Sequence, residues 1–183
     1  MNTVLLLIDI QRDYFPGGRM PLDSPEPAAR RAAALLAAFR DDQRPIAHVH
    51  HHAVRPDASF LAPGTVGVDP WPDVVPLDGE PVFIKHHPNA FRDTDLAAWL
   101  ESHHATTLLV AGMMTHMCVD ATVRAAADQG WQVGVAADAC ATRTLVWDGR
   151  DVPAASVHAA FLAALQGTYA DVRSTERWLG DRG

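Results

Sequence analysis

The chain has 183 residues, of which 48% are hydrophobic and 20% charged, and 15 Lys and Arg stand against 22 Asp and Glu. This length predicts a single domain over residues 1–183 that buries a core without help from disulfide bonds, and two cysteines make no disulfide framework. The formal charge of −7 argues against nucleic acid or an anionic lipid surface as a partner, because both bind clustered positive charge.

The first apolar run of the chain, Val4–Ile8, stops at Asp9 and has no basic residues before it. It is too short for a secretory signal, and no apolar stretch approaches the length of a membrane span. We therefore expect a soluble, cytoplasmic protein with no membrane contact.

Short apolar segments alternate along the chain with longer amphipathic ones. The segments expected to form strands are Val4–Asp9, Pro45–His50, Pro81–Lys85, Thr106–Ala111, Gln132–Ala137 and Thr168–Val172. The segments expected to form helices are Glu26–Arg40, Thr94–Ser102, Thr115–Gln129 and Pro153–Gln166, with Gly130 and Gly167 just past the ends of the last two. Uniformly apolar strands that alternate with helices predict an α/β protein whose parallel sheet is covered on both faces.

The segment His51–Asp78 is rich in proline and shows little periodicity. A loop this long inside a compact domain usually serves a function. We expect it to form either a flap over a binding site or a contact between subunits.

Three reactive side chains follow different predicted strands. Asp9 ends the first, Lys85 ends the third, and Cys118 lies at the start of the helix after the fourth. Ligands of open parallel sheets bind at the carboxyl ends of strands, so we expect these side chains to meet at one edge. A helix N-terminus and a nearby ammonium group favour the thiolate, which is the nucleophilic form of cysteine. Together the three suit covalent acyl transfer, with Asp9 as general base.

Each of these residues also has a purely structural interpretation. Taken singly, Asp9 caps a turn, Lys85 is a solvated strand end and Cys118 is an inert buried thiol. Their joint placement at the ends of strands favours the chemical interpretation.

Three separated motifs resemble those of the isochorismatase-like cysteine hydrolases, and the similarity spans nearly the whole chain in the family's order. The motifs are Leu7–Phe15 (LIDIQRDYF), Ile84–His86 (IKH) and Ala111–Val119 (AGMMTHMCV), and the match extends through Pro63–Thr65, Asp120–Gly130 and Ala137–Cys140. The resemblance implies a three-layer α/β/α sandwich around a Rossmann-like parallel sheet of about six strands in the order 3-2-1-4-5-6.

The resemblance also implies a catalytic triad of Asp9, Lys85 and Cys118. It implies a cis peptide bond between Met113 and Met114, and an oxyanion hole formed by the backbone amides of Met114 and Cys118. The implied reaction is hydrolysis of a C–N amide bond in a small molecule through a thioester, with ammonia or an amine leaving first. True isochorismatases lack a cysteine at this position, so Cys118 favours an amidase, and its surroundings are most similar to a subgroup that includes streptothricin hydrolase.

One alternative is a nicotinamidase, which would hold a metal ion on an aspartate and histidines after the second strand. The corresponding stretch reads HVHHH over residues 48–52, with His50 at the position of the aspartate. Neighbouring residues of an extended segment point to opposite faces, so His50 and His52 are expected to converge and His51 is not. Because no carboxylate joins them, we predict no metal ion and no other cofactor. A second alternative is a non-catalytic member of the fold in which Cys118 reacts with oxidants.

Further residues are candidates for the walls of the substrate pocket. They are Tyr14, Phe15, His50, Trp71, Asn89, Phe91 and His116. Asn89 is equally suited to cap a turn, and aromatic residues near a sheet edge often serve packing alone. The helices Glu26–Arg40 and Pro153–Gln166 offer apolar faces, and family members commonly form dimers or tetramers, so we expect a homo-oligomer that acts on a small amide.

Overall fold

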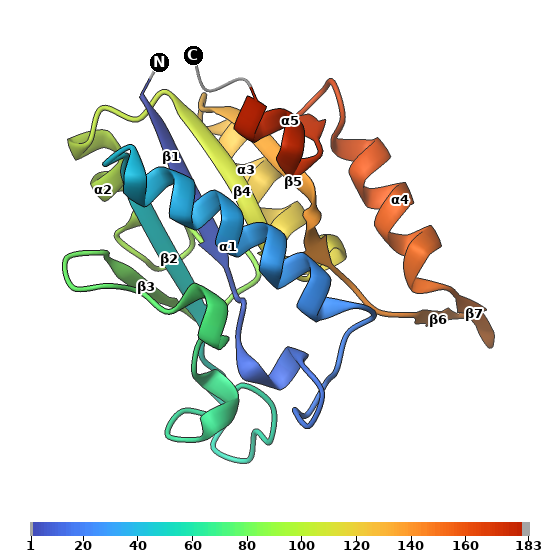
Figure 1. Cartoon of the computed structure of the whole chain (residues 1–183). Helices are drawn as coiled ribbons and strands as arrows, with labels where there is room; N and C mark the ends of the chain where they lie inside the picture. The colour runs from blue at the N-terminus through green and yellow to red at the C-terminus, as the bar shows by residue number, and fades with distance from the viewer. Residues whose placement is uncertain (1, 181–183) are drawn as a thin grey trace.

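The computed structural model describes residues 2–180, and these contain a six-stranded parallel sheet. Its strands are β1 (Thr3–Ile8), β2 (Ile46–His51), β3 (Val82–Lys85), β4 (Thr107–Met113), β5 (Gln132–Ala141) and β8 (Asp171–Arg173). Their order across the sheet is β3-β2-β1-β4-β5-β8, and every neighbouring pair is parallel. The predicted α/β topology is therefore confirmed, with β8 as the sixth strand (Figure 1).

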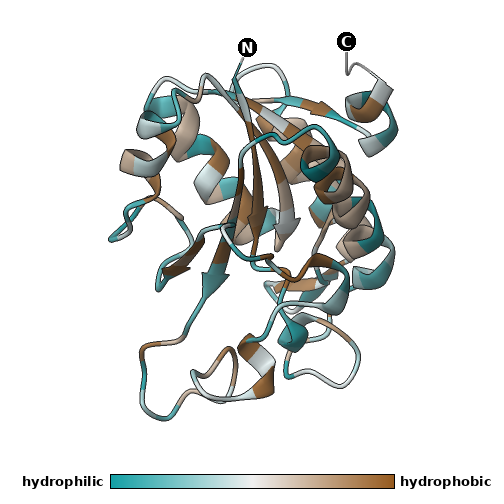
Figure 2. Ribbon diagram, turned by 60° about the vertical axis from the view of Figure 1, so that its left-hand side comes forward, coloured by the Kyte–Doolittle hydropathy of each residue, from teal (hydrophilic) through white to brown (hydrophobic). Residues whose placement is uncertain are grey.

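Helices cover both faces of this sheet. They are α1 (Pro25–Asp41), α2 (Leu96–Ser102), α3 (Asp120–Asp128), α4 (Ala154–Leu165) and α5 (Thr175–Gly180). Residues of α1 and α5 pack in one apolar cluster with Leu5 and Leu7, whereas residues of α2, α3 and α4 pack in another with Leu6 and Ile8. Figure 2 shows the hydrophobic strands enclosed between helices whose outer sides are hydrophilic. None of the helices within residues 2–180 is long and apolar enough to cross a lipid bilayer.

The position of each strand in the sheet follows from its sequence. β1 is apolar on both faces, and residues Val4–Ile8 are almost completely buried at the centre of the sheet. β3, by contrast, has only four residues and pairs only with β2 among the described strands, and its Val82 and Ile84 side chains are exposed. A short strand with partly exposed side chains is typical of the edge of a sheet.

The region between β5 and α4, for which the sequence predicts no strand or helix, contains two short strands. An antiparallel hairpin of β6 (Leu145–Trp147) and β7 (Arg150–Val152) projects there from the body of the molecule (Figure 1). Its turn residues, Asp148 and Gly149, both have positive φ angles. An Asp-Gly pair between two short strands is the sequence signal for such a two-residue turn.

The predicted helix Thr115–Gln129 is divided into two parts. It begins with a π-helical turn over Thr115–Val119, and α3 continues it. Gly130 ends α3 with a φ of 94°, in the left-handed region that glycine adopts without steric cost.

The long loop between β2 and β3 is attached to the chain segment that follows β1. The Gln11 side chain donates a hydrogen bond to the Val68 carbonyl oxygen at 2.9 Å, and the Asp13 carboxylate accepts one from the Leu61 amide at 2.6 Å. Short 3₁₀ turns over Arg12–Tyr14 and Val66–Val68 contact each other, and a third over Pro72–Val74 contacts α1. The loop therefore lies next to the carboxyl end of β1.

Candidate active site

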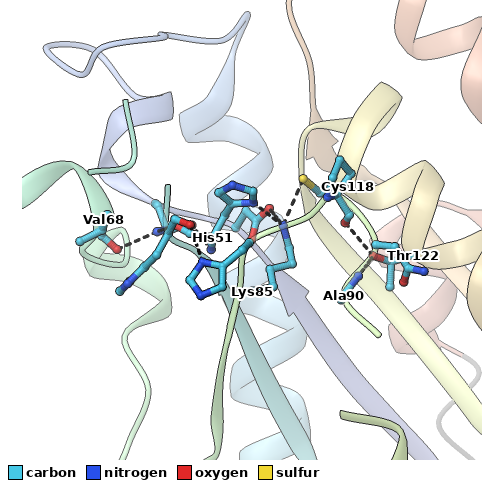
Figure 3. A network of polar contacts seen from close by, with 12 residues as sticks. His51, Val68, Lys85, Ala90, Cys118 and Thr122 are labelled. Atoms are coloured by element: carbon cyan, nitrogen blue, oxygen red, sulfur yellow. Dashed lines mark hydrogen bonds and ion pairs between the residues drawn. The ribbon is translucent and has the colours of Figure 1, made fainter. Parts of the chain in front are cut away.

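Four side chains meet at the carboxyl ends of the central strands. The Lys85 Nζ atom lies 2.7 Å from Asp9 Oδ2, 3.2 Å from Cys118 Sγ and 3.0 Å from His51 Nδ1 (Figure 3). The Asp9 and Lys85 side chains are completely inaccessible to solvent, and Cys118 is 5% exposed. The structure thus brings together the three predicted residues and adds His51 as a fourth.

The backbone at the ends of β1 and β4 allows this close approach. Asp9 follows β1 with a φ of 52°, which costs a residue with a side chain about 1–3 kcal/mol. Gly112 has a φ of 141°, and a Cβ atom there would lie 2.0 Å from the Ile8 carbonyl oxygen. Only glycine therefore allows β4 to come this close to the end of β1.

Cys118 lies in the π-helical turn that follows β4. The Met114 carbonyl oxygen accepts hydrogen bonds from the amides of Met117 and Val119, and the peptide bond between Met113 and Met114 is cis. This turn holds Cys118 Sγ against Lys85.

Burial decides the protonation of the site. It raises the pKa of the Asp9 carboxyl, and the charge and hydrogen bond of Lys85 oppose that rise. It also raises the pKa of the Cys118 thiol, which the negative charge of Asp9 raises further while Lys85 opposes both. The expectation of a thiol with a lowered pKa is therefore wrong for the resting site, because desolvation outweighs the ammonium group and the helix N-terminus. Burial therefore favours the neutral thiol at rest, and the Asp9 carboxyl group lies across Lys85 from it.

The histidines of β2 alternate between the two faces of the sheet, but His51, and not the predicted His50, is on the side of the reactive groups. His51 pairs with Lys85 in the register of β2 and β3 and points toward its ammonium group. His48 and His50 point the other way, where His48 hydrogen-bonds to Glu80 at 2.8 Å and the ring centre of His50 lies 6.5 Å from that of His48. Of the histidines of β2, His51 therefore lies against the reactive groups, in place of the predicted His50.

One group of at least three potential metal ligands is present within residues 2–180. A carboxylate oxygen of Asp9, a ring nitrogen of His51 and Cys118 Sγ lie within 4.8 Å of one another. The Lys85 ammonium contacts all three residues, and its positive charge opposes a cation at the same position. The pair suggested by the sequence, His50 and His52, belongs to no such group in this part of the chain.

One of the candidate pocket residues, Tyr14, lies close to the reactive groups. Tyr14 is buried, and burial together with the negative charge of Asp9 raises its pKa, so the phenol is neutral. Another candidate, His116, hydrogen-bonds through Nδ1 to the Thr142 hydroxyl group. This contact joins the π-helical turn that contains Cys118 to the residue after β5.

The remaining candidates serve packing or turns. The Phe15 ring stacks on Trp71 with 3.8 Å between ring centres, which fastens the long loop to the segment after β1. The Asn89 side-chain oxygen, Oδ1, accepts a hydrogen bond from the Phe91 amide at 2.9 Å and caps a turn. Phe91 stacks on Trp131, which follows the C-terminal end of α3, so its ring points away from Cys118 at the other end.

Arg143 is a residue near the site that no sequence motif indicated. It follows β5, and its positive charge acts on Tyr14 and on His116. Its Nε atom is buried without a hydrogen-bond partner, and within residues 2–180 no carboxylate lies within 4.0 Å of its guanidinium group. A buried, unpartnered donor at the rim of a site is suited to a ligand.

Comparisons with known proteins agree with this geometry. The chain is 50% identical over 179 residues to YddQ, an uncharacterized isochorismatase family protein of Bacillus subtilis, covering 98% of this chain and 99% of the relative. It is 34% identical to a streptothricin hydrolase of Streptomyces noursei (82% of this chain, 51% of the relative) and 29% identical to a maleamate amidohydrolase of Pseudomonas putida (93% and 82%). The crystal structure of a protein described as an isochorismatase hydrolase from Oleispira antarctica superposes with a TM-score of 0.95 at 46% identity, covering 98% of this chain and 96% of that one.

The family model for the isochorismatase domain matches residues 3–177, which include every strand and almost every helix of the structure. Since this match covers nearly the whole chain and the fold is the same as that of the solved relatives, the protein belongs to the isochorismatase family.

Proposed function

We propose that the protein hydrolyses a C–N amide bond of a small molecule through a thioester on Cys118. The observation that carries the proposal is the buried contact of Lys85 with both Asp9 and Cys118, which places a base, a cation and a nucleophile within hydrogen-bond distance. The similarity to a streptothricin hydrolase and to a maleamate amidohydrolase supports an amide as the substrate.

In the first half of the reaction Asp9 accepts the proton of the Cys118 thiol, and Sγ attacks the amide carbon. The carbonyl oxygen gains a negative charge, which the backbone amides of Met114 and Cys118 stabilise. Asp9 then gives its proton to the nitrogen, the C–N bond breaks, and ammonia or an amine leaves. Lys85 orients Asp9 and Sγ throughout.

In the second half Asp9 accepts a proton from water, and the resulting hydroxide attacks the thioester carbon. The C–S bond breaks, the acid is released, and the proton returns from Asp9 to Sγ. The raised pKa of Asp9 suits this role, because a carboxylate with a raised pKa is a stronger base.

The first test is hydrolysis of an amide panel by the wild-type protein and by Cys118→Ala. The panel contains maleamate, nicotinamide and streptothricin, and intact-mass analysis searches for an acyl adduct on the protein. We expect turnover of at least one amide, loss of turnover in Cys118→Ala, and unchanged activity in Cys140→Ala, which removes the other cysteine. Hydrolysis that persists in Cys118→Ala contradicts the thioester, and activity that is lost on chelation favours a metal-dependent enzyme.

Arg143 supports a substrate that carries a carboxylate in addition to its amide group. Its buried, unpartnered Nε atom and its positive charge beside Tyr14 provide a binding site for an anion. In the same panel we expect maleamate to be preferred over uncharged nicotinamide. Arg143→Gln is expected to raise KM for maleamate and to leave KM for nicotinamide unchanged, and equal effects on both amides would contradict this assignment.

A further inference from the structure

The ammonium group of Lys85 meets three partner atoms, the first in an ion pair and the other two in hydrogen bonds. These are Asp9 Oδ2 at 2.7 Å, His51 Nδ1 at 3.0 Å and Cys118 Sγ at 3.2 Å. Because the Lys85 side chain is completely buried, water does not substitute for a missing acceptor. Each of the three contacts therefore has a part in fixing the direction of the ammonium group.

The His51 ring is able to accept this hydrogen bond only when Nδ1 carries no proton. Burial, followed by the positive charges of Lys85, His86, His52 and His87, lowers the pKa of His51 to about 4. At neutral pH the ring is thus uncharged, with its proton on Nε2.

The backbone of His51 is held independently of its ring. The Gln11 side chain accepts a hydrogen bond from the His51 amide at 2.8 Å and donates one to the His51 carbonyl oxygen at 3.0 Å. The parallel register places His51 opposite Lys85 in β3. A substitution of the ring therefore removes one acceptor and leaves the two backbone contacts that fix the residue.

We infer that His51 is a positioning residue: through Nδ1 it keeps the Lys85 ammonium group directed at Cys118. The inference rests on the proposed function, in which Cys118 is the nucleophile. Without this acceptor one N–H bond of Lys85 has no partner in a site without water, so the ammonium group turns toward its remaining acceptors and is no longer held in line with Cys118. The thiolate then loses the positive charge that stabilises it, and less of it forms at a given pH.

The test compares two nearly isosteric substitutions, His51→Leu and His51→Asn. The Asn side-chain oxygen takes nearly the place of Nδ1 and accepts a hydrogen bond, whereas Leu does not. The readout is the rate of alkylation of Cys118 by iodoacetamide at pH 8, in a Cys140→Ala background so that one thiol reacts. We expect the rate to fall at least tenfold in His51→Leu, which corresponds to about one unit in the thiol pKa, and to stay within about threefold of wild type in His51→Asn.

His52→Leu is the matched control, because it removes the neighbouring ring but keeps the His52 amide that donates to the Lys85 carbonyl oxygen. Circular dichroism checks folding, and His51→Val replaces His51→Leu if the latter does not fold. Equal alkylation rates in His51→Leu and His51→Asn overturn the inference, because a merely structural role of the ring lowers the rate in both variants. A loss of rate in His52→Leu as large as that in His51→Leu also overturns it.

Alkylation requires no substrate, so it separates this inference from the proposed reaction. If no amide is hydrolysed but the alkylation rate depends on the acceptor at position 51, the inference stands and the proposed reaction fails. If an amide is hydrolysed and His51→Leu keeps both the wild-type kcat and the wild-type alkylation rate, the inference alone fails.

Discussion

Asp9 and Lys85 form an ion pair from which water is excluded, and this pair constrains the residues around it. Substitution of one partner of a buried pair leaves the other charge uncompensated, which costs about 3–5 kcal/mol. We expect Asp9→Asn to lower the free energy of unfolding by this amount, and the double variant Asp9→Asn/Lys85→Met to recover most of the loss.

Urea denaturation monitored by circular dichroism measures both variants, with Cys118→Ala as a control that keeps the ion pair. If the double variant is no more stable than Asp9→Asn alone, the uncompensated ammonium is not the source of the loss.

The sequence predicts Asp9, Lys85 and Cys118 because each follows an apolar strand or the turn after it, and parallel strands end at a common edge. It does not predict His51, because the side of the sheet that a residue faces depends on the strand register, and a shift of one residue reverses every side chain. The alternation of side chains assigns His50 to the pocket and His51 to the opposite face, whereas His51 is the histidine that contacts Lys85. Arg143 gives no signal at all, since a single arginine after a strand resembles any solvated residue.

At the scale of elements, Glu80 joins three segments of the fold. Its carboxylate accepts hydrogen bonds from Arg40 of α1 at 2.7 and 2.8 Å, from His48 of β2 at 2.8 Å and from the Leu77 amide at 3.0 Å. Burial alone would raise its pKa, but these donors and the charge of Arg40 lower it to about 2. The carboxylate therefore holds α1 and β2 against the turn before β3.

A carboxyl group whose pKa is lower in the folded than in the unfolded protein stabilises the fold at a pH above its pKa in the unfolded chain. This stabilisation is lost as the pH falls to the pKa of the group in the folded protein. We expect Glu80→Gln to reduce the free energy of unfolding by about 2 kcal/mol at pH 7, allowing for partial solvent screening. Between pH 4.5 and pH 2 the difference from wild type should shrink toward zero.

Urea titrations at pH 7 and pH 3 measure this dependence. The control is Asp57→Asn, because the Asp57 carboxylate pairs with Arg55 in full view of solvent and should have no effect at either pH. A constant difference between Glu80→Gln and wild type at both pH values would contradict the electrostatic origin.

The elements that the sequence predicts well are those with long apolar patterns, such as β1, β4 and α1. The sequence predicts the start of β5 but places its end at Ala137, before the observed end at Ala141. The last residues, Asp138–Ala141, include a polar residue and small ones that carry little hydrophobic pattern. The hairpin of β6 and β7 was missed because three-residue strands are too short for periodicity, and the Asp148-Gly149 turn is their one clear signal.

At the scale of the whole molecule, the hairpin of β6 and β7 lies outside the two apolar clusters that form the core. Its Trp147 and Val146 side chains are 79% and 68% exposed, and the neighbouring helix α4 presents exposed alanines. Exposed apolar surface of this kind is typical of protein interfaces. We expect a second copy of the chain to cover it, in agreement with the predicted homo-oligomer.

Size-exclusion chromatography with light scattering tests this expectation. The double variant Val146→Ser/Trp147→Ser should shift the protein toward the monomer, whereas Val54→Ser, which changes an equally exposed valine of the long loop, should not. A wild-type protein that is monomeric at all concentrations would rule out the interface.

The position of β3 at the edge of the sheet determines which part of the protein we expect to unfold first in denaturant. Strands at an edge open at lower free energy than the strands between them, because fewer hydrogen bonds and apolar contacts hold them. Lys85 ends this edge strand, whereas Asp9 and Cys118 belong to segments next to the central strands β1 and β4. In rising urea, inactivation should therefore precede loss of the far-ultraviolet dichroism, and a partly denatured population should keep its helices while its Cys118 loses the neighbouring ammonium.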